Sequence, residues 1–397
     1  MNINFKKRFQ SNPIVKSIIC FKILFLCLYF SPPPQFRFSE YSNPILKVHL
    51  DYISQKRTTY FSSFSPINVW GKKNIRQSKK ISVKMDKDGN IIINNKFKLK
   101  NSAFIYSSDP IQLKKFAYDG AIRIIASKNG YQIINYIKTE KYLEGVINAE
   151  INSNWPVEAV KTQAVIARTY ALHHYIQRRN SKWHISDTES DQVYKGDTVS
   201  DERAYQSVLQ TEGQIIKNEH GIIEAFYHSN SGGHTEDTVN IWHGKTSFIK
   251  ASPTEYGQTD PNYNWKYKIS KSRFAKVLNR KGFRVGNIKK MVVSQRFDSG
   301  RVKGLEIFHS KENKILRIKG VQLLRVLGNR KIRSLLFSIN INKDNILFQG
   351  KGFGHGVGLC QWCAKEMATF GQMYDEIINY FYHDVEIATF KIPNKGI

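Results

Sequence analysis

The stretch TEKYLEGVINAEINSNWPVEAVKTQAVIARTYALHH, residues 139–174, predicts two helices joined at a tight corner. Leu143, Val146 and Ile147 follow the spacing of a single helix face, and that face should turn inward because all three are apolar. Glu150 is the next residue on the same face, one turn beyond Val146. The sequence therefore predicts a carboxylate on the buried side of a helix, near its end.

The second helix begins around Pro156. Proline suits the first helical turn, where a missing N–H costs little, and Glu158 follows in the same turn, where a negative charge is favoured. An apolar stripe of mostly small residues, which permit close packing, then follows at helical spacing: Val157, Val160, Ala164, Ala167 and Ala171.

Glu150 is a candidate general acid because of this corner. A carboxylate partly shielded from water at its mouth has a raised pKa, which suits it to donate a proton. Spacing alone also fits an exposed helix-end residue with no catalytic task, so both interpretations stay open at this point.

The composition is that of a globular protein with a large excess of positive charge. A chain of 397 residues can hold one large or two ordinary domains, and 41% apolar and 13% aromatic residues suit a packed core. The net charge is +29, and residues 1–100 hold 19 Lys or Arg against four Asp or Glu. Such a balance suits nucleic acid, anionic lipid or anionic cell-wall polymer as a partner, or a solvated lysine-rich surface with none.

The N-terminus has the features of an export signal. Basic residues precede an apolar run from Ile18 to Phe30, and prolines close it, so residues 1–35 are predicted to be a signal peptide or a membrane anchor. We therefore expect an exported protein of the cell envelope. Export conflicts with nucleic acid as the partner, which leaves membrane or wall polymer as the expected contact of the basic N-terminal part.

The predicted fold is α+β, with a basic tether and entry segment at 36–100 and one large mixed domain at 101–397. Strand-like patches run from Phe104 to Ile137, with turn signals at Asp119-Gly120 and Asn129-Gly130. Further elements are expected at Gln214–Ile216 (strand), Ile222–Tyr227 (strand), 283–348 (strands with a helical patch near Val321 to Leu327) and a late helix with Ile377, Ile378 and Phe381 on one face.

Three polar or glycine-rich stretches carry further candidates. Residues 186–194 form an acidic loop that could bind a cation, orient substrate hydroxyls or simply be solvated. Residues 227–236 are dense in Ser, His and Gly, but no G-x-S-x-G elbow supports a serine nucleophile. Residues 350–358 place glycine at every second position around His355, so that a ligand or another backbone can approach closely.

A C-x-x-C pair, Cys360 and Cys363, opens the helix predicted after those glycines. One such pair is not a structural zinc site, which needs four ligands. A local disulfide, a redox pair and two unpaired thiols all stay open.

Taken in order, these stretches resemble the stage II sporulation protein D family of bacterial cell-wall proteins. The resemblance covers roughly residues 105–392. It rests on the following segments: YLEGV (142–146) leading to Glu150, WPVEAVKTQAV (155–165), ARTYA (167–171), DQVY (191–194), SNSGG (229–233), GHGVG (354–358) and the closing helix at 374–382.

The resemblance implies an exported lytic transglycosylase. Enzymes of this family cut peptidoglycan glycan strands between N-acetylmuramic acid and N-acetylglucosamine, prefer strands from which an amidase has removed the stem peptides, and leave 1,6-anhydro ends. The family's catalytic Glu falls on Glu150. The resemblance implies these substrate-binding residues: Arg168, Tyr170, Gln192, Tyr194, Ser229, Ser231, Gly232, Gly354, His355, Gly356 and Gln361.

The chain also departs from the family pattern. Asn152 stands where the family usually has a proline, and Trp362 lies within the C-x-x-C that replaces a Ser-Gln-x-Gly-Ala segment. Some relatives hold zinc through His and Cys near the acidic loop, whereas this chain has His184 there and no cysteine, so we predict no metal and no cofactor. These departures keep a second hypothesis open, a non-catalytic glycan-binding or septal scaffold.

Overall fold

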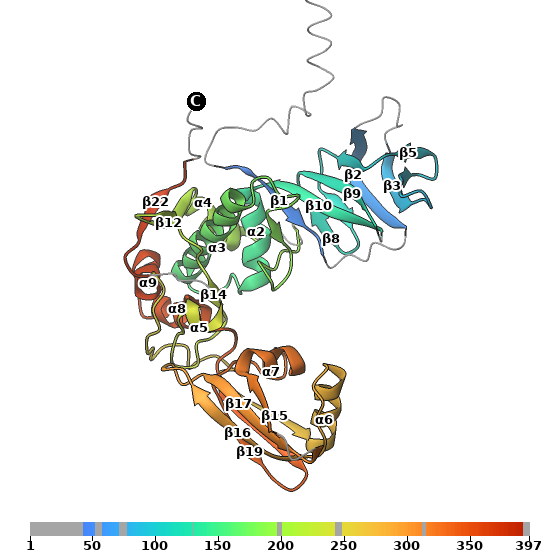
Figure 1. Ribbon diagram of the computed structural model, residues 1–397. Helices are drawn as coiled ribbons and strands as arrows, with labels where there is room; N and C mark the ends of the chain where they lie inside the picture. The colour runs from blue at the N-terminus through green and yellow to red at the C-terminus, as the bar shows by residue number, and fades with distance from the viewer. Residues whose placement is uncertain are drawn as a thin grey trace, which may run out of the picture.

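The computed structural model describes residues 43–51, 58–70, 78–128, 130–196, 201–242, 248–311 and 315–391. The predicted signal or anchor at 1–35 lies outside these residues. The described part contains eight helices and several β-sheets, which confirms the α+β class. Figure 1 shows a sheet formed by the N-terminal strands, a group of helices in the middle, and a lobe below them.

An eleven-stranded sheet occupies the N-terminal part, in the order β11-β1-β10-β9-β6-β2-β3-β4-β5, with β7 and β8 attached through β2. Its strands are β1 (Ile45–His49), β2 (Thr59–Trp70), β3 (Ser78–Met85), β4 (Ile91–Ile93), β5 (Phe97–Leu99), β6 (Ser102–Tyr106), β7 (Ile111–Leu113), β8 (Phe116–Tyr118), β9 (Ala121–Ser127), β10 (Gly130–Lys138) and β11 (Ile185–Ser186). Strands from both sides of residue 100 therefore pair in one sheet, as β2 does with β6. The division of the chain into domains stays a prediction.

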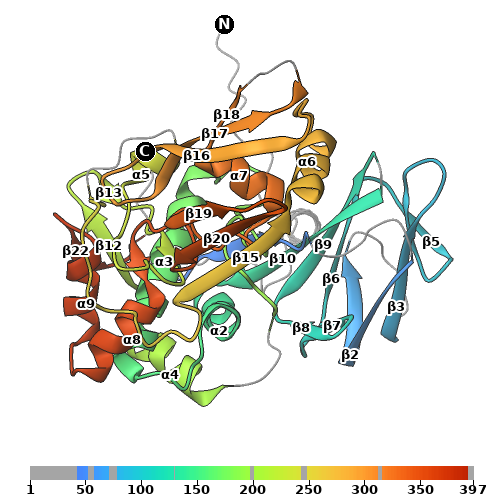
Figure 2. The ribbon, with the colours of Figure 1, turned by 90° about the horizontal axis from the view of Figure 1, so that it is seen from below.

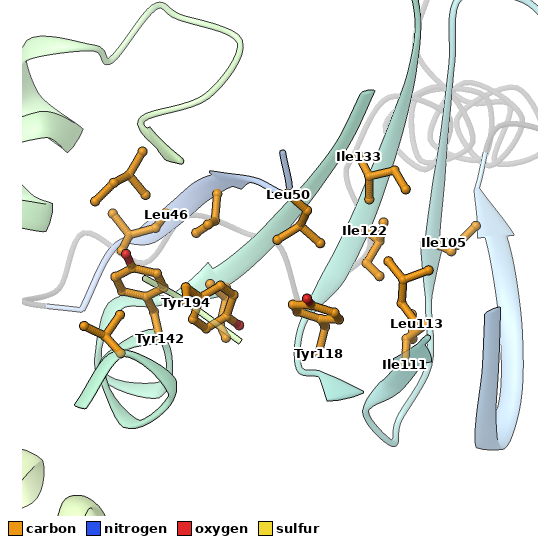
Figure 3. Packing of buried hydrophobic residues seen from close by; sticks show 14 of the residues in the cluster. Leu46, Leu50, Ile105, Ile111, Leu113, Tyr118, Ile122, Ile133, Tyr142 and Tyr194 are labelled. Atoms are coloured by element: carbon orange, nitrogen blue, oxygen red, sulfur yellow. The ribbon is translucent and has the colours of Figure 1, made fainter. Parts of the chain in front are cut away.

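The two predicted helices are confirmed as α2 (Thr139–Glu150) and α3 (Val157–Gln177), with Pro156 as the N-cap of α3. The inward face of α2 buries Leu143, Val146 and Ile147, as their spacing predicts. Figure 3 shows Tyr142 of α2 beside Tyr194 and Leu46, where the helix packs against the sheet.

Helix α3 is buried along most of its length and on every face from Ala164 to Leu172. Its neighbours are α2, α4 (Glu202–Gln210), β12 (Gln214–Asn218), α8 (Gln361–Thr369) and α9 (Tyr374–Phe381). The alanines predicted to permit close packing, Ala164, Ala167 and Ala171, are fully buried in this arrangement. The face of Ile377, Ile378 and Phe381 predicted for the late helix is buried in α9.

Two small sheets connect this helical part. Strand β12 pairs with β13 (Gly221–Ile222) and β22 (Glu386–Thr389), while β14 (Tyr227–His228) runs parallel to β21 (Leu359–Cys360). The single strand predicted for Ile222–Tyr227 is therefore wrong, because only its ends are strands. Between them the Phe226 N–H bonds to the Glu224 carbonyl in a tight turn that interrupts the ladder.

The insertion lobe, residues 264–351, lies in the chain between β14 and β21 and has a hydrophobic core of its own. Figure 2 shows its strands and its two helices together. Its elements are β15 (Asn264–Ser270), α6 (Lys271–Arg280), β16 (Ile288–Arg296), β17 (Val302–His309), β18 (Ile315–Lys319), α7 (Gly320–Leu327), β19 (Phe337–Ile341) and β20 (Asn345–Lys351). Helix α7 confirms the helical patch predicted here. A one-turn helix, α5 (Thr238–Ile241), precedes the lobe.

Among the described helices, none is both long enough and apolar enough to cross a bilayer.

Candidate active site

Glu150 is the last residue of α2, and its side chain is half-buried. One carboxylate oxygen accepts a 2.7 Å hydrogen bond from the backbone N–H of Val193. Burial raises the pKa of Glu150, the hydrogen bond from the Val193 N–H and the nearby Tyr227 hydroxyl lower it, and the charge of Glu189 raises it further. The net direction is upward, and the negative end of the helix dipole acts in the same direction.

Two tyrosines and a glutamine surround this carboxylate. The Tyr142 hydroxyl donates to Gln192 Oε1 at 3.2 Å, and Gln192 Nε2 donates to the Ala167 carbonyl at 3.3 Å. The buried hydroxyl of Tyr227 has no hydrogen bond of normal geometry within the described residues, although Glu150 and Gln192 are close enough to affect its pKa. Burial raises the pKa values of Tyr142 and Tyr227 well above the usual range, so both hydroxyls keep their protons.

The acidic loop is built into the fold through its aspartates. Asp191 accepts hydrogen bonds from the Ser186 N–H at 2.8 Å and from Arg178 at 3.3 Å, and Tyr170 donates to it at 3.4 Å. Asp187 accepts from the Asp51 N–H at 2.9 Å. These carboxylates bond to the protein's own donors, so neither a cation site nor a freely solvated loop describes them. No cluster of His, Cys, Asp or Glu suited to a metal ion occurs in the described parts of the chain.

Arg168 has a structural role. Its side chain is fully buried and forms a two-pronged ion pair with Glu140, at 2.8 Å from Nε to Oε1 and 2.6 Å from the terminal nitrogen to Oε2. The remaining donors bond to the carbonyls of Val208 and Gln214. Because the guanidinium is occupied and out of reach of solvent, the prediction that Arg168 binds substrate has to be corrected.

Tyr194 and Tyr170 are also held inside the protein. The Tyr194 hydroxyl bonds to Asn135 at 2.9 Å, and its ring packs against Tyr118 and Tyr142. Tyr170 is 7% exposed and packs edge-on against His174. Both residues support the loop that carries Gln192 and Val193, so the structure places them behind the site rather than on its surface.

The glycine stretch does not form an open, extended floor. Gly352, Gly354, Gly356 and Gly358 all have positive φ values, which favour glycine, so the segment turns repeatedly. A Cβ at Gly356 would collide with the guanidinium of Arg301, an insertion-lobe residue. The close approach that the glycines permit is therefore used by the protein itself.

His355 lies in an aromatic and cationic setting. Its ring packs 4.8 Å from Trp242 and 5.5 Å from His228, and its Nδ1 accepts the Val357 N–H at 3.0 Å. Burial, with the charge of Arg301, lowers the pKa of His355 to about 4. The imidazole is therefore neutral at physiological pH. The backbone of Tyr227 partly offsets the fall in the pKa of His355, while the side chain of Tyr227 faces Glu150. One residue therefore connects the two groups.

The remaining predicted residues line the Ser-Gly loop and the start of α8. The Ser229 carbonyl accepts a hydrogen bond from the Trp362 N–H at 3.0 Å, and the carbonyl of buried Ser231 accepts one from the Arg301 guanidinium at 2.7 Å. Gly232 has positive φ and lies against the backbone of Lys351. Gln361 is buried and bonds to Gln163 of α3 at 3.3 Å. These contacts fix the loop beside Tyr227, and they leave Ser231, Gly232 and Gln361 little free surface.

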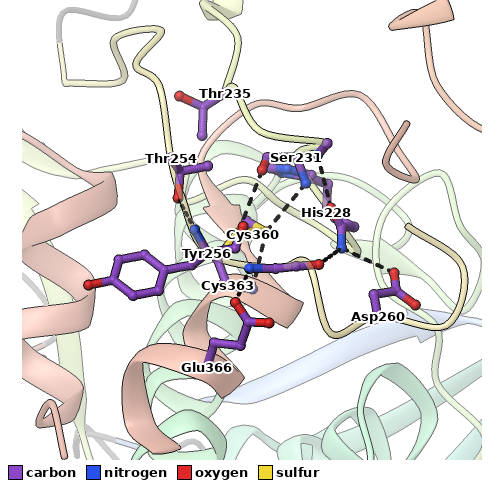
Figure 4. Close-up of a disulfide and its surroundings, with 12 residues drawn as sticks. His228, Ser231, Thr235, Thr254, Tyr256, Asp260, Cys360, Cys363 and Glu366 are labelled. Atoms are coloured by element: carbon purple, nitrogen blue, oxygen red, sulfur yellow. Dashed lines mark hydrogen bonds between the residues drawn. A yellow bond between two sulfur atoms is a disulfide. The ribbon is translucent and has the colours of Figure 1, made fainter. Parts of the chain in front are cut away.

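Cys360 and Cys363 form a disulfide, which settles the alternatives left open by the sequence. Figure 4 shows it beneath the Ser-Gly loop, where the Ser231 N–H bonds to the Cys360 sulfur at 3.3 Å. The disulfide closes the first turn of α8 around Trp362. The ring of Trp362 packs 5.0 Å from that of Trp155, which lies in the corner after Glu150.

A cavity of about 320 Å³ lies at this corner, between α3 and α4. Trp155, Ser153 and Val157 line it from the corner side, and Glu202, Arg203 and Gln206 line it from α4. The surface of this cavity is mostly apolar, with the Trp155 ring beside a few hydrogen-bonding side chains, and such a lining suits the apolar face of a ligand such as a sugar.

The arrangement as a whole can hold and transfer one proton. It offers a carboxylic acid with a raised pKa, an amide that fixes its orientation and a buried tyrosine hydroxyl that has no hydrogen-bond partner among the described residues. Sequence reasoning identified Glu150 but missed Tyr227 as a site residue. The only signal was that Tyr227 ends a strand directly before the Ser-Gly loop, and this does not show which way its side chain points.

Comparison with known proteins finds similarity to one family. The family model described as "Stage II sporulation protein" matches residues 127–217, which contain Glu150 and the loop that bonds to it. The stage II sporulation protein D of Bacillus subtilis is 26% identical over 286 residues, covering 67% of this chain and 79% of that protein. The chain is therefore similar to the stage II sporulation protein D family, most directly over the segment that holds Glu150.

Other matches extend further along the chain. An uncharacterized protein of Brachyspira hyodysenteriae is 27% identical over 316 residues, covering 77% of this chain and 83% of that one. The amidase enhancer of B. subtilis is 21% identical over 294 residues, or 62% of this chain and 40% of the enhancer. A model described only as a domain of unknown function matches residues 235–358, a range that includes the insertion lobe.

Proposed function

We propose that this protein is an exported cell-envelope enzyme that cleaves peptidoglycan glycan strands without stem peptides and leaves 1,6-anhydro ends. The observation that carries the proposal is the half-buried carboxyl of Glu150, which the Val193 amide orients and whose pKa is raised by burial. The similarity to stage II sporulation proteins and to a relative named amidase enhancer supports a role in remodelling the wall, in sporulation or in division, together with an amidase.

In the proposed reaction Glu150 acts twice. Its carboxyl proton goes to the glycosidic oxygen as the bond to the anomeric carbon of N-acetylmuramic acid breaks. The carboxylate then takes the proton of the C6 hydroxyl as that oxygen attacks the anomeric carbon. The ring closes as the 1,6-anhydro product, no water is consumed, and Glu150 is protonated again. One carboxyl therefore serves both steps, unlike the usual pair of carboxyls in glycosidases.

The neighbouring groups fit these steps. The Val193 N–H stabilises the carboxylate formed after the first transfer, and the Tyr227 hydroxyl can donate to it at the same moment. The Trp155 ring and the polar side chains of the adjoining cavity offer a surface on which a sugar of the strand can stack.

The test is direct detection of the product. Full-length protein is incubated with amidase-treated glycan strands, and the ends are analysed by mass spectrometry for anhydro sugars. We expect Glu150→Gln to abolish the product while Glu144→Gln, a change on the same helix at a residue paired with Lys141, leaves it intact. Strand binding without any product from the wild type would favour the scaffold hypothesis instead.

A further inference from the structure

Two parts of this chain carry its positive charge: residues 1–100, with a net charge of +15 (19 minus 4), and the insertion lobe. Residues 264–351 hold 23 Lys or Arg and four Asp or Glu, a net charge of +19. Residues 101–263 and 352–397 together hold 19 Lys or Arg and 24 Asp or Glu, a net charge of −5. A uniform lysine-rich bias would have spread over both parts, so the lobe's charge is a property of the lobe.

These cations are free to meet a partner. Most are exposed, including Lys266, Lys268, Arg325, Arg330 and Lys331. Within the described residues of the lobe, one ion pair occurs, between Arg317 and Glu306. A surface of this kind repels itself and gains free energy from a polyanion that neutralises it.

The lobe is attached beside the candidate active site. Its chain leaves after β14 and returns at β21, and these two strands pair directly. Asn329, which follows α7, donates a 2.7 Å hydrogen bond to Glu189, whose charge raises the pKa of Glu150. On the inner side, Arg301 bonds to the carbonyls of Ser231 and His234. A polymer held on the α7 side of the lobe therefore lies next to the loop that contacts Glu150.

We propose that the insertion lobe binds the glycan strand through the carboxylates that the strand exposes once its stem peptides are gone. The proposal rests on the proposed function, because it concerns the same substrate. N-acetylmuramic acid carries a lactyl carboxyl that is an uncharged amide while the peptide is attached and a carboxylate after an amidase has removed it. Each disaccharide of a denuded strand thus carries one carboxylate directly on its sugar, and the exposed cations of the lobe can pair with a row of such carboxylates along the strand.

The test compares binding of three probes to the full-length protein carrying Glu150→Gln, so that no strand is cut. The probes are denuded glycan strands, neutral oligomers of N-acetylglucosamine, and vesicles containing anionic lipid. The lobe variant carries Arg325→Gln, Arg330→Gln and Lys331→Gln. The control removes the same charge from exposed positions elsewhere, with Lys115→Gln, Lys128→Gln and Lys182→Gln.

We expect the lobe variant to bind denuded strands roughly tenfold more weakly at low salt, with a smaller loss of affinity on adding salt, and the control to behave as the parent. Binding of the neutral oligomer should be the same in all three proteins. An equal loss in the lobe variant and the control, or no loss, would overturn the proposal. So would a loss confined to the anionic vesicles, which would assign the lobe to the membrane. Lobe-dependent binding by a wild type that makes no anhydro product would leave this inference standing and remove the proposed function.

Discussion

The position of Glu150 at the end of α2 determines the pKa of its carboxyl. Burial and the charge of Glu189 favour the protonated carboxyl, while the Val193 amide and Tyr227 favour the carboxylate. Because burial is the largest of these influences, the acid form persists to a higher pH than it would in water. The group can therefore start the reaction as an acid and still return to it as a base.

The pH dependence of cleavage follows from the raised pKa. We expect kcat for strand cleavage to fall as the pH rises through the pKa of Glu150 in the substrate complex, because the proton donor is lost. The same shift acts on folding: the folded state holds this proton more tightly than the unfolded chain, so its contribution to stability is present at acid pH and lost as the pH rises. In Glu150→Gln the free energy of unfolding should lose this part of its pH dependence. A wild-type rate that kept rising across this pH range would contradict the assignment.

Tyr227→Phe separates stability from activity at one residue. The hydroxyl is buried and lacks a hydrogen bond of normal geometry, so its removal should raise the free energy of unfolding by about 1 kcal/mol. The same change should lower kcat about a hundredfold, because a donor to the Glu150 carboxylate is lost. Denaturant titration and product analysis on one preparation measure both. An unchanged kcat would show that the hydroxyl has no role in the reaction.

At this scale the sequence predicted side-chain faces but not partners. The spacing of Leu143, Val146 and Ile147 was enough to direct Glu150 inward. The spacing could not show that Arg168 forms an ion pair with Glu140, because that contact joins two helices whose relative placement depends on the whole fold. The same limit explains Arg301, which comes from a segment distant in sequence to fill the space left by Gly356.

The junction of α2 and α3 depends on the ion pair between Glu140 and Arg168. Each stands on one of the two helices, and both bond further to the chain around α4 and β12, Arg168 to Val208 and Gln214, and Glu140 to the Gly213 N–H. The pair therefore ties four elements, α2, α3, α4 and β12, together at the helix that carries Glu150.

Breaking this pair should be costly for stability and mild for substrate affinity. Arg168→Met leaves Glu140 without its partner, and we expect a loss of about 3–5 kcal/mol in the free energy of unfolding, measured by denaturant titration. Adding Glu140→Leu should recover much of it, because no uncompensated charge remains. Arg168→Lys keeps the positive charge but loses several of the hydrogen bonds, and in this variant KM should stay unchanged. A large rise in KM at full stability would return Arg168 to the binding surface.

The elements predicted best were those with strong local periodicity. Helices α2, α3, α7 and α9 follow from patterns within a dozen or so residues, and Pro156 marks a boundary by its own chemistry. The failed strand at Ile222–Tyr227 had the right composition, but its ends pair with different partners, β12 on one side and β21 on the other. Composition does not report such a change of partner.

The whole molecule divides its charge as well as its core. The insertion lobe has a separate hydrophobic cluster and a net charge of +19, while residues 101–263 with 352–397 are slightly acidic. A separate core favours separate unfolding, and crowded like charges weaken the lobe at low ionic strength.

Thermal unfolding should therefore deviate from a single two-state transition. We expect calorimetry at low salt to show a lower transition from the lobe, and its Tm to rise on adding salt by more than that of the remainder, because screening relieves the repulsion. Equal van't Hoff and calorimetric enthalpies, with one Tm that salt does not move, would show instead that the lobe and the rest unfold together.

The pairing of Tyr227 with Leu359 and of His228 with Cys360 brings together points more than a hundred residues apart along the chain. Whatever lies between them leaves and rejoins the protein at nearly one place. Because the two ends of this segment meet, it can be lengthened, exchanged or shortened to a short loop without changing the arrangement of the helices around Glu150. The same helices could thus carry inserted segments that bind different polymers, in different bacteria or in engineered variants.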